Sequence, residues 1–352
     1  MVSTMKGGYM AQKARIIQCG LGAVGAELTK VILDKQNMEI VAAVDISDKI
    51  IGKDLGQVIG LGRDVGITVS GNIGDVMRTV DADVVLLSTT SYFNDMFGMA
   101  KEALEAGKNV ITPGEEGGFP WTATPDLARH IDELAKKRGC TFLGTGMTPG
   151  FIMDYLPISL TSLVKKVDRI IIRGVANWAG VSAYDFALAG FGKSIEEFKG
   201  GVARGEIGGL ICLKGLMEET AEALDWRIDE YKETKKGIIS KSRRVADYGV
   251  VEPDTVCGFE QNAHGFWQGK EVITYNRCYY VHPTLEEDGV EVGFIYLIEG
   301  EPGVEATLKG EVVTRHLILG TAARMVNSIP QVIAAPPGLR SVYELPTSPC
   351  LP

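Results

Sequence analysis

The sequence predicts an α/β protein built on a doubly wound parallel sheet, with a second α+β domain that contains a mixed or antiparallel sheet. Three observations support this fold class. Near the N-terminus a glycine-rich turn joins an apolar run to an amphipathic helix, and apolar runs then alternate with helical patterns as far as Gly144. From about Val167, strand-like runs follow one another without helices between them. A chain of 352 residues is also longer than one core usually supports.

The first βαβ unit begins with the apolar strand 15–19 and the turn Gly20-Leu21-Gly22-Ala23-Val24-Gly25. The helix that follows has an apolar face, formed by Val24, Leu28, Val31 and Ile32. A second apolar run, Ile40–Val44, leads into Asp45, twenty residues after Gly25. This glycine spacing, with an acidic residue at this distance, indicates a Rossmann-type dinucleotide-binding unit. A structural βαβ turn without a ligand is the alternative.

All six residues of the turn belong to the predicted cofactor site. Gly20 would allow the tight turn, Gly22 the close approach of the pyrophosphate, and Gly25 the packing of helix on strand. The three residues between them complete the turn at the helix N-terminus, where free N–H groups and the helix dipole favour negative charge.

Asp45 bears on the choice of cofactor. A carboxylate there accepts hydrogen bonds from the ribose hydroxyls of NAD and repels the 2′-phosphate of NADP. NAD is therefore expected. Lys49 and Arg63 follow shortly after, and NADP is possible if they fold over the ribose. Solvated loop charges are the alternative interpretation of both side chains.

Composition excludes several classes of function. The net charge of −9 argues against a nucleic-acid partner, which normally requires a basic face. No apolar run approaches the roughly 20 residues that span a bilayer, and residues 1–10 lack the apolar segment of a signal peptide, so a cytoplasmic protein is expected. The six cysteines include no Cys-x-x-Cys pair, which predicts reduced thiols and no metal site.

The remaining elements of the first domain alternate in type. The run 84–88 predicts a strand, and the next helix carries an apolar stripe that consists of Phe93, Met96, Phe97, Ala100 and Leu104. A strand at Asn109–Thr112, a helix from Pro125 to Arg138 capped by Gly139, and a strand at Thr141–Gly144 follow.

The second domain is predicted from its strand-like runs, at 168–173, 272–275, 291–298 and 306–313. A final amphipathic helix, His316 to Ser328, should return to the nucleotide domain before a Pro-rich segment at 330–338. We therefore expect a dinucleotide-binding domain over 1–150, completed by 316–352, and a domain for substrate binding and oligomerisation over 151–315. A homodimer is expected because an antiparallel sheet needs its open face covered.

Three loops lie at predicted carboxyl ends of strands, where ligands bind in such sheets. The first contains the hydroxyls of Ser88, Thr89 and Thr90, near the expected nicotinamide ribose. Capping of the following helix by Ser91 or Asn94 is the alternative role of this loop.

The second loop, Pro113 to Trp121, carries Glu115 and Glu116 side by side. Adjacent carboxylates are usually solvated, but one of them at the mouth of a cofactor cleft could act as a general acid/base. In the third loop, Thr145 to Phe151, Thr148 and Pro149 are predicted to contact the cofactor at the start of a helix.

Five short segments of the chain carry motifs of glycine, proline and polar residues. These segments are 20–25, 52–56, 112–121, 145–151 and 334–339. In these segments the chain resembles the 2,4-diaminopentanoate dehydrogenases and the related native amine dehydrogenases, which have a dihydrodipicolinate-reductase-like nucleotide domain. The resemblance implies NAD(P)-dependent oxidative deamination of an amine such as 2,4-diaminopentanoate to a ketone and ammonia, reversible as reductive amination. It also implies that Glu115 or Glu116 is the acid/base.

The expected partners are accordingly a small amine or ketone and ammonia. Candidate pocket residues lie in both domains, and they are Trp121, Met147, Asn177, Trp178 and His264. Core packing is the alternative for Asn177 and Trp178, and a structural role is the alternative for His264.

Two other functions are compatible with the sequence. One is a reductase or dehydrogenase of a semialdehyde or cyclic imine on the same scaffold, which should carry a lysine or histidine pair where this chain has Glu115 and Glu116. The other is a non-catalytic NAD-binding sensor. An absorbance assay with a panel of amines distinguishes a sensor from an enzyme.

Overall fold

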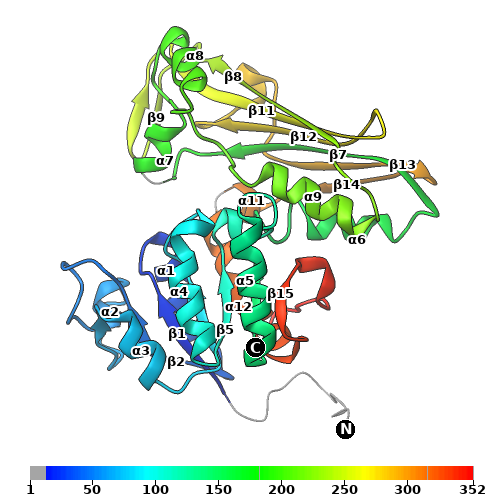
Figure 1. Cartoon of the computed structure of the whole chain (residues 1–352). Coiled ribbons are helices and arrows are strands. Elements are labelled where there is room, and N and C mark those ends of the chain that lie inside the picture. Colours follow the sequence, from blue (N-terminus) through cyan, green and yellow to red (C-terminus); the bar gives the residue numbers. More distant parts are fainter. Residues whose placement is uncertain (1–12, 182, 315, 352) are drawn as a thin grey trace. The chain divides into compact units, whose positions relative to one another are not determined.

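A computed structural model describes residues 13–181, 183–314 and 316–351 (Figure 1). Residues 1–10, which the sequence analysis compared with a signal peptide, lie outside this range. The described residues divide into two compact units, the first running to Phe151 and resuming at Ile318, and the second running from Ile152 to Leu317.

The first unit contains a seven-stranded sheet in which every neighbouring pair is parallel. The strand order is β15-β6-β5-β4-β1-β2-β3. The strands are β1 (Ala14–Cys19), β2 (Met38–Val44), β3 (Val69–Ser70), β4 (Val84–Leu87), β5 (Asn109–Thr112), β6 (Thr141–Gly144) and β15 (Gly338–Arg340). The chain moves outward from β1 in both directions, as in the predicted doubly wound fold.

Helices connect these strands. They are α1 (Ala23–Leu33), α2 (Leu55–Val58), α3 (Ile73–Thr79), α4 (Phe93–Glu105), α5 (Pro125–Arg138) and α12 (Leu317–Ala334), with short 3-10 turns η1 (Glu115–Gly117) and η2 (Val342–Glu344). The bounds predicted for α5 are confirmed, and Gly139 ends this helix in the left-handed conformation at φ 71°.

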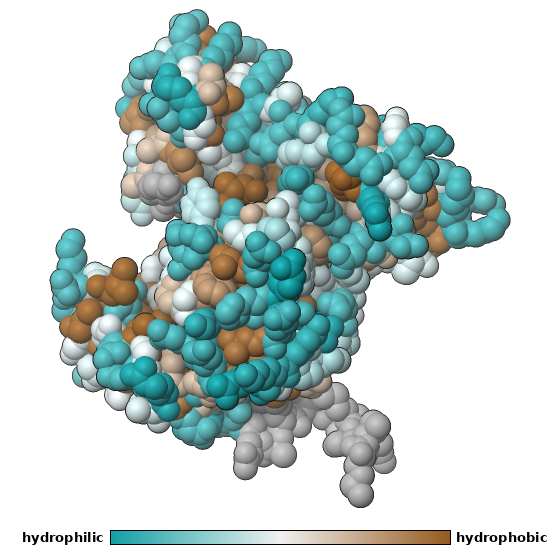
Figure 2. Space-filling model, viewed as in Figure 1, coloured by the Kyte–Doolittle hydropathy of each residue, from teal (hydrophilic) through white to brown (hydrophobic). Residues whose placement is uncertain are grey.

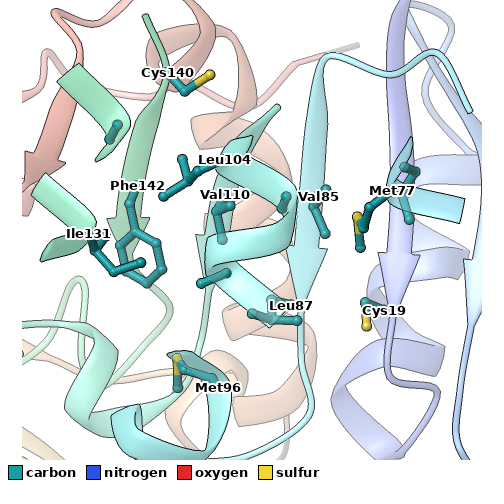
Figure 3. Close-up of a cluster of buried hydrophobic side chains, with 14 of the residues drawn as sticks. Cys19, Met77, Val85, Leu87, Met96, Leu104, Val110, Ile131, Cys140 and Phe142 are labelled. Atoms are coloured by element: carbon teal, nitrogen blue, oxygen red, sulfur yellow. The ribbon is translucent and has the colours of Figure 1, made fainter. Parts of the chain in front are cut away.

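The core of the first unit lies on both faces of the sheet. On one face α3, α4 and α5 pack apolar side chains against the strands, and Figure 3 shows Ile131 of α5 beside Phe142 of β6. Ile17 belongs to this cluster, whereas the adjacent Ile16 is equally buried and must point to the other face, because side chains alternate along a strand.

The last helix is longer than predicted. The prediction ended it at Ser328, but α12 continues through Pro330 to Ala334. Proline removes one N–H and crowds the carbonyl of residue i−4, and near a helix end the lost bonding is small enough for packing to outweigh it. Of the described residues, α12 is the one helix whose length and mean hydropathy reach the minimum for a membrane span, and part of it is buried inside the protein like a core helix.

The second unit contains a six-stranded mixed sheet of order β14-β13-β7-β12-β11-β8. Its strands are β7 (Lys166–Asn177), β8 (Glu230–Ile239), β11 (Val256–Trp267), β12 (Lys270–Tyr280), β13 (Gly293–Glu301) and β14 (Val304–Leu308). Only the β7–β12 pair is parallel within this sheet. The predicted mixed sheet is thus present, and β7 and β12 are longer than the apolar runs that indicated them.

One face of the second sheet is covered by helices of the same unit, including α8 (Ile195–Ala203) and α9 (Leu213–Ala223). The other elements are α6 (Tyr155–Thr161), α7 (Ala183–Leu188), α10 (Leu285–Asp288), α11 (Glu311–Thr314) and the hairpin strands β9 (Arg244–Ala246) and β10 (Gly249–Val251). The strand predicted over 306–313 is wrong beyond Leu308, since Gly310 (φ 120°) starts a turn and 311–314 are helical.

Candidate active site

The glycine-rich turn is formed as predicted between β1 and α1, and each glycine meets a different constraint. Gly20 has φ +88°, and a Cβ on it would lie 2.4 Å from the carbonyl oxygen of Ser88. A Cβ on Gly25 would lie 1.9 Å from the carbonyl oxygen of Gly20. A Cβ on Gly22 would have no atom within 4 Å. The fold itself thus requires glycine at positions 20 and 25, because a side chain there would clash with the backbone. At Gly22 the space beside the Cα is empty of protein atoms.

The N-terminus of α1 fits the pyrophosphate of a dinucleotide. Gly22 is the N-cap residue, and no side chain caps the helix. The first N–H groups of a helix have no intrahelical acceptor, so they point toward the open space at Gly22. Leu21, Ala23 and Val24 would hold the group here together with the three glycines.

Asp45 lies beside the same turn. Its carboxylate accepts hydrogen bonds from the N–H of Leu21 at 2.8 Å and from the N–H of Ser47 at 2.9 Å. Burial, together with the charge of Asp45, raises the pKa of the Cys19 thiol to about 12, so this thiol is inert. Lys49 and Arg63 are exposed.

Sequence analysis did not identify Ile46, which follows Asp45 and is 90% exposed. Ile51 nearby is also exposed, and Figure 2 shows a small apolar group on the first unit among mostly hydrophilic residues. An exposed isoleucine directly after the acid predicted to bind the ribose was a detectable signal, because an adenine ring bound there would need an apolar surface.

The hydroxyl of Ser88 makes a structural contact that the sequence did not predict. Its hydroxyl lies 3.1 Å from the carbonyl oxygen of Gly20 and accepts a hydrogen bond from Nε2 of Gln18 at 2.8 Å. It therefore fastens the glycine-rich turn to the end of β4. Thr89 is exposed, and the hydroxyl of Thr90 accepts a hydrogen bond from the N–H of Tyr92.

The two adjacent glutamates differ in their surroundings. Oε2 of Glu116 accepts a hydrogen bond at 2.7 Å from the N–H of Phe93, the first residue of α4. The N–H of Glu116 donates to the carbonyl oxygen of Ser91 at 3.0 Å. Glu116 therefore caps α4, a role that the sequence suggested for Ser91 or Asn94. Glu115 is half-buried at the start of η1.

Close contacts between glycines and neighbouring loops bring the three predicted loops together. A Cβ on Gly114 would lie 2.6 Å from the carbonyl oxygen of Thr90, and one on Gly118 would lie 2.5 Å from Cβ of Pro149. A Cβ on Gly144 would lie 2.0 Å from the carbonyl oxygen of Gly117. The carboxyl ends of β4, β5 and β6 thus form one site.

The third loop is not the start of a helix. Residues 145–154 form turns, and the next helix, α6, begins at Tyr155 in the second unit. The loop is held instead by α12, because the hydroxyl of Thr321 accepts a hydrogen bond from the N–H of Met147 at 3.3 Å. Met147 and Pro149 are buried and Thr148 is half-buried.

Most of the other pocket candidates are engaged in packing or hydrogen bonds within their own units. Trp121 packs against the core of the first unit, and the ring of Trp178 lies 4.6 Å from that of Tyr279. The side-chain oxygen of Asn177 accepts hydrogen bonds from the N–H groups of Ala179 and His282, both at 3.1 Å.

His264 belongs to a charged cluster on the sheet of the second unit. Its Nδ1 lies 2.7 Å from the carboxylate of Glu271, which also pairs with Arg169 at 2.8 Å. These contacts correspond to the structural alternative that was considered for His264.

Comparison with known proteins decides the family. Residues 151–352 match the 2,4-diaminopentanoate dehydrogenase C-terminal domain, and residues 14–114 match the N-terminus of dihydrodipicolinate reductase. A 2,4-diaminopentanoate dehydrogenase of Acetoanaerobium sticklandii is 33% identical over 95% of this chain and 94% of its own length. The chain belongs to the 2,4-diaminopentanoate dehydrogenase family. It is an NAD(P)-dependent amine dehydrogenase, as the sequence predicted.

Three further similarities bear on this assignment. An amine dehydrogenase of Streptomyces virginiae is 21% identical over 94% of this chain and 96% of its own length. The solved amine dehydrogenase of Mycobacterium smegmatis, 24% identical, has the same fold, with a TM-score of 0.82 over 96% of this chain and 98% of its own. A 4-hydroxy-tetrahydrodipicolinate reductase of Syntrophomonas wolfei is similar over only 40% of this chain and 48% of its own length, so the cyclic-imine alternative gains no support from the whole chain.

Proposed function

We propose that this amine dehydrogenase oxidises a 2,4-diaminopentanoate-like amine to a ketone and ammonia, with Glu115 as the general acid/base. The observation that supports this assignment is the position of Glu115. It starts η1 where the carboxyl ends of β4, β5 and β6 meet, and Glu116 beside it accepts the N–H of Phe93 at the N-terminus of α4. The glycine contacts that gather these loops would hold Glu115 at a defined place.

The cofactor would be held by the turn 20–25 and by Asp45. The pyrophosphate would occupy the space at Gly22, and Ile46 would provide an apolar surface for the adenine. Asp45 favours NAD, because its carboxylate repels a 2′-phosphate. When bound, the nicotinamide accepts a hydride from the amine-bearing carbon.

Glu115 would perform the proton transfers. Its carboxylate would pair with the substrate ammonium and take one proton, which leaves the neutral amine that can lose hydride. Once Glu115 has released that proton to solvent, water attacks the resulting iminium and the carboxylate would take a proton from the water, which gives a carbinolamine. The same carboxyl would then protonate the amine nitrogen and accept the hydroxyl proton as the C–N bond breaks, so that ammonia leaves and the ketone forms.

Two single variants test this proposal. Glu115→Gln should lower the rate of amine oxidation at saturating NAD by about 10²- to 10⁴-fold, the usual loss for a general acid/base. Glu116→Gln should keep most of the rate and lower stability by roughly 1 kcal/mol, because a neutral amide is a weaker partner for a helix N-terminus. If neither rate falls by more than a few fold, the acid/base lies elsewhere.

The open face of the second sheet is the proposed homodimer interface. This face includes Arg173, Asn276, Cys278 and Ile295, and it borders a groove of about 630 Å³. Ile295 is 38% exposed on β13, where an apolar side chain needs a cover. Sedimentation at micromolar concentration should find dimers that Ile295→Arg converts to monomers. A wild-type monomer would contradict the proposal.

A cytoplasmic location and the absence of nucleic-acid partners remain part of the proposal. They rest on the net charge of −9 and on the composition of the chain.

A further inference from the structure

The side chain of Thr112 joins the ends of two strands at the candidate active site. Thr112 is the last residue of β5 and is fully buried. The backbone register of β4 with β5 ends at the pair Leu86 and Ile111. One residue further on, the hydroxyl of Thr112 donates a hydrogen bond of 2.8 Å to the carbonyl oxygen of Leu87. A side chain therefore continues the pairing of these strands where the backbone ladder stops.

The sequence explains why the backbone ladder stops there. In a parallel ladder, carbonyl groups two residues apart accept from N–H groups two residues apart. The N–H of Asn109 donates to the carbonyl oxygen of Asp83. By this alternation the carbonyl of Leu87 faces residue 113, which is Pro113 and has no N–H. The Thr112 hydroxyl takes the place of the missing donor.

The same hydroxyl also begins the turn that carries Glu115. Its oxygen accepts the N–H of Gly114 at 3.0 Å, while its own proton is given to the strand carbonyl. The methyl group lies at the other end of the turn, because a Cβ on Gly117 would lie 2.6 Å from Cγ2 of Thr112. The N–H of Gly117 closes the turn on the carbonyl oxygen of Gly114 at 2.9 Å. One threonine side chain thus lies against both ends of η1.

Loss of this hydroxyl should move the turn. Both of its hydrogen bonds are buried, so water cannot replace it. The carbonyl of Leu87 and the N–H of Gly114 would be left unpaired, which is costly for buried backbone groups. The turn relieves this cost by shifting, and Glu115 follows Gly114 directly in the chain. A general acid/base must lie within hydrogen-bond reach of its proton, and a shift of about 1 Å lowers a rate by about 10²-fold.

A second buried threonine of the same sheet shows a role that is only structural. Thr141 is the first residue of β6 and is 1% exposed. Its hydroxyl donates to the carbonyl oxygen of Pro336 at 3.3 Å. Because the strands are parallel, the first residue of a strand lies at the opposite edge of the sheet from the carboxyl ends that form the site. Thr141 therefore provides a matched control for Thr112.

We propose that Thr112 is a positioning residue for amine oxidation, and that its hydroxyl fixes the place of Glu115. This inference rests on the proposed function, in which Glu115 is the general acid/base, and adds the group that holds it. Thr112 takes no part in the proton transfers, because it is buried and its hydroxyl is bonded to two backbone groups.

Single variants test this role with 2,4-diaminopentanoate at saturating NAD, with each rate expressed per site that binds NADH. Thr112→Val keeps the shape of the side chain and removes the hydroxyl, so kcat should fall by roughly 10- to 100-fold while the KM for NAD changes by no more than a few fold. Thr112→Ser keeps the hydroxyl and should restore kcat to within a few fold of the wild type. Thr141→Val should lose thermal stability without losing kcat. Equal kcat in Thr112→Val and Thr112→Ser would overturn the proposal.

A double variant tests whether Thr112 acts through Glu115. Glu115→Gln removes the acid/base, so adding Thr112→Val to it should lower kcat by no more than a few fold more. A threonine that only supports the fold would give the same fold loss in both backgrounds. A further loss as large as that of the single variant would contradict the proposal.

Thr112→Cys covers the case in which Thr112→Val does not fold, because a thiol has a similar volume and is a weak donor. It should lower kcat in the same direction and to a smaller extent, and full kcat in this variant would overturn the proposal. Full activity in Glu115→Gln would refute the proposed function and this inference with it. Full activity in Thr112→Val, beside a strongly impaired Glu115→Gln, would refute only the role of Thr112.

Discussion

The two units of this enzyme hold their polar groups in different ways. In the first unit, backbone contacts position the site, because glycines let β1, β4, β5 and β6 approach one another at their carboxyl ends. In the second unit, the important groups are long side chains on a mixed sheet, and their surroundings depend on strand register. Arg277 on β12 meets Phe294 on β13 only because β7 lies between the two strands and carries Gly174. The close backbone contacts of the first unit leave almost no room for an added side-chain atom. The side chains of the second unit depend instead on how their charges are paired.

The largest effect should come from breaking the charge balance at Arg244 in the second unit. Arg244→Met leaves Glu287 and the buried Asp288 without their cation, and removing one partner of a buried pair costs about 3–5 kcal/mol. Denaturant unfolding should show this loss. A free energy of unfolding equal to that of the wild type would contradict this role of Arg244.

In the first unit, two glycine variants should distinguish an effect on folding stability from an effect on NAD affinity. The Cβ of Gly25→Ala would lie 1.9 Å from the carbonyl oxygen of Gly20, so unfolding should cost roughly 1–3 kcal/mol less. The Cβ of Gly22→Ala meets no protein atom, so this variant should keep its stability and lose NAD affinity. Thermal unfolding with and without NAD measures both effects. If Gly22→Ala binds NAD normally, the pyrophosphate does not approach this residue.

The sequence could predict much of the first unit because its contacts are encoded locally. The spacing of Gly20, Gly22 and Gly25 and the distance to Asp45 specify a turn and a strand within about thirty residues. The role of Ser88 was missed because the hydroxyl binds the turn across about seventy residues of chain, and no local pattern reports such a partner.

The second unit was less predictable for the same physical reason. β8 (Glu230–Ile239) was missed because it is a charged edge strand, exposed along most of its length, without the apolar alternation of a half-buried strand. The surroundings of Arg277 could not be predicted because they follow from the pairing of β12 with β7 and of β7 with β13. The sequence shows an arginine in an apolar run, but not which side chains of the neighbouring strands face it.

A smaller effect is expected at the ribose. Asp45→Ala removes the carboxylate that would repel a 2′-phosphate, so NAD should weaken by roughly tenfold and NADP should gain relative to it. The carboxylate also accepts the N–H groups of Leu21 and Ser47, so a modest loss of stability should accompany the change. Asp45→Asn separates the two effects, because its side-chain oxygen can still accept one of these bonds. Unchanged affinity for both cofactors in both variants would show that Asp45 serves only the turn.

The smallest effect is expected on the stability of the second unit at acidic pH, where Glu287 becomes protonated. Hydrogen bonds from the Ser242 hydroxyl and from Arg244 lower the pKa of Glu287 from an ordinary value of 4.5 to about 2. A carboxyl whose pKa is lower in the folded state contributes stability that is complete above the ordinary pKa and is lost as the pH falls through the folded value. The contribution should therefore decline between about pH 4.5 and pH 2. Glu287→Gln cannot titrate, so the difference in thermal midpoint between wild type and variant should shrink as the pH falls through this window. A difference that stays constant would mean that the carboxylate gains nothing from these partners.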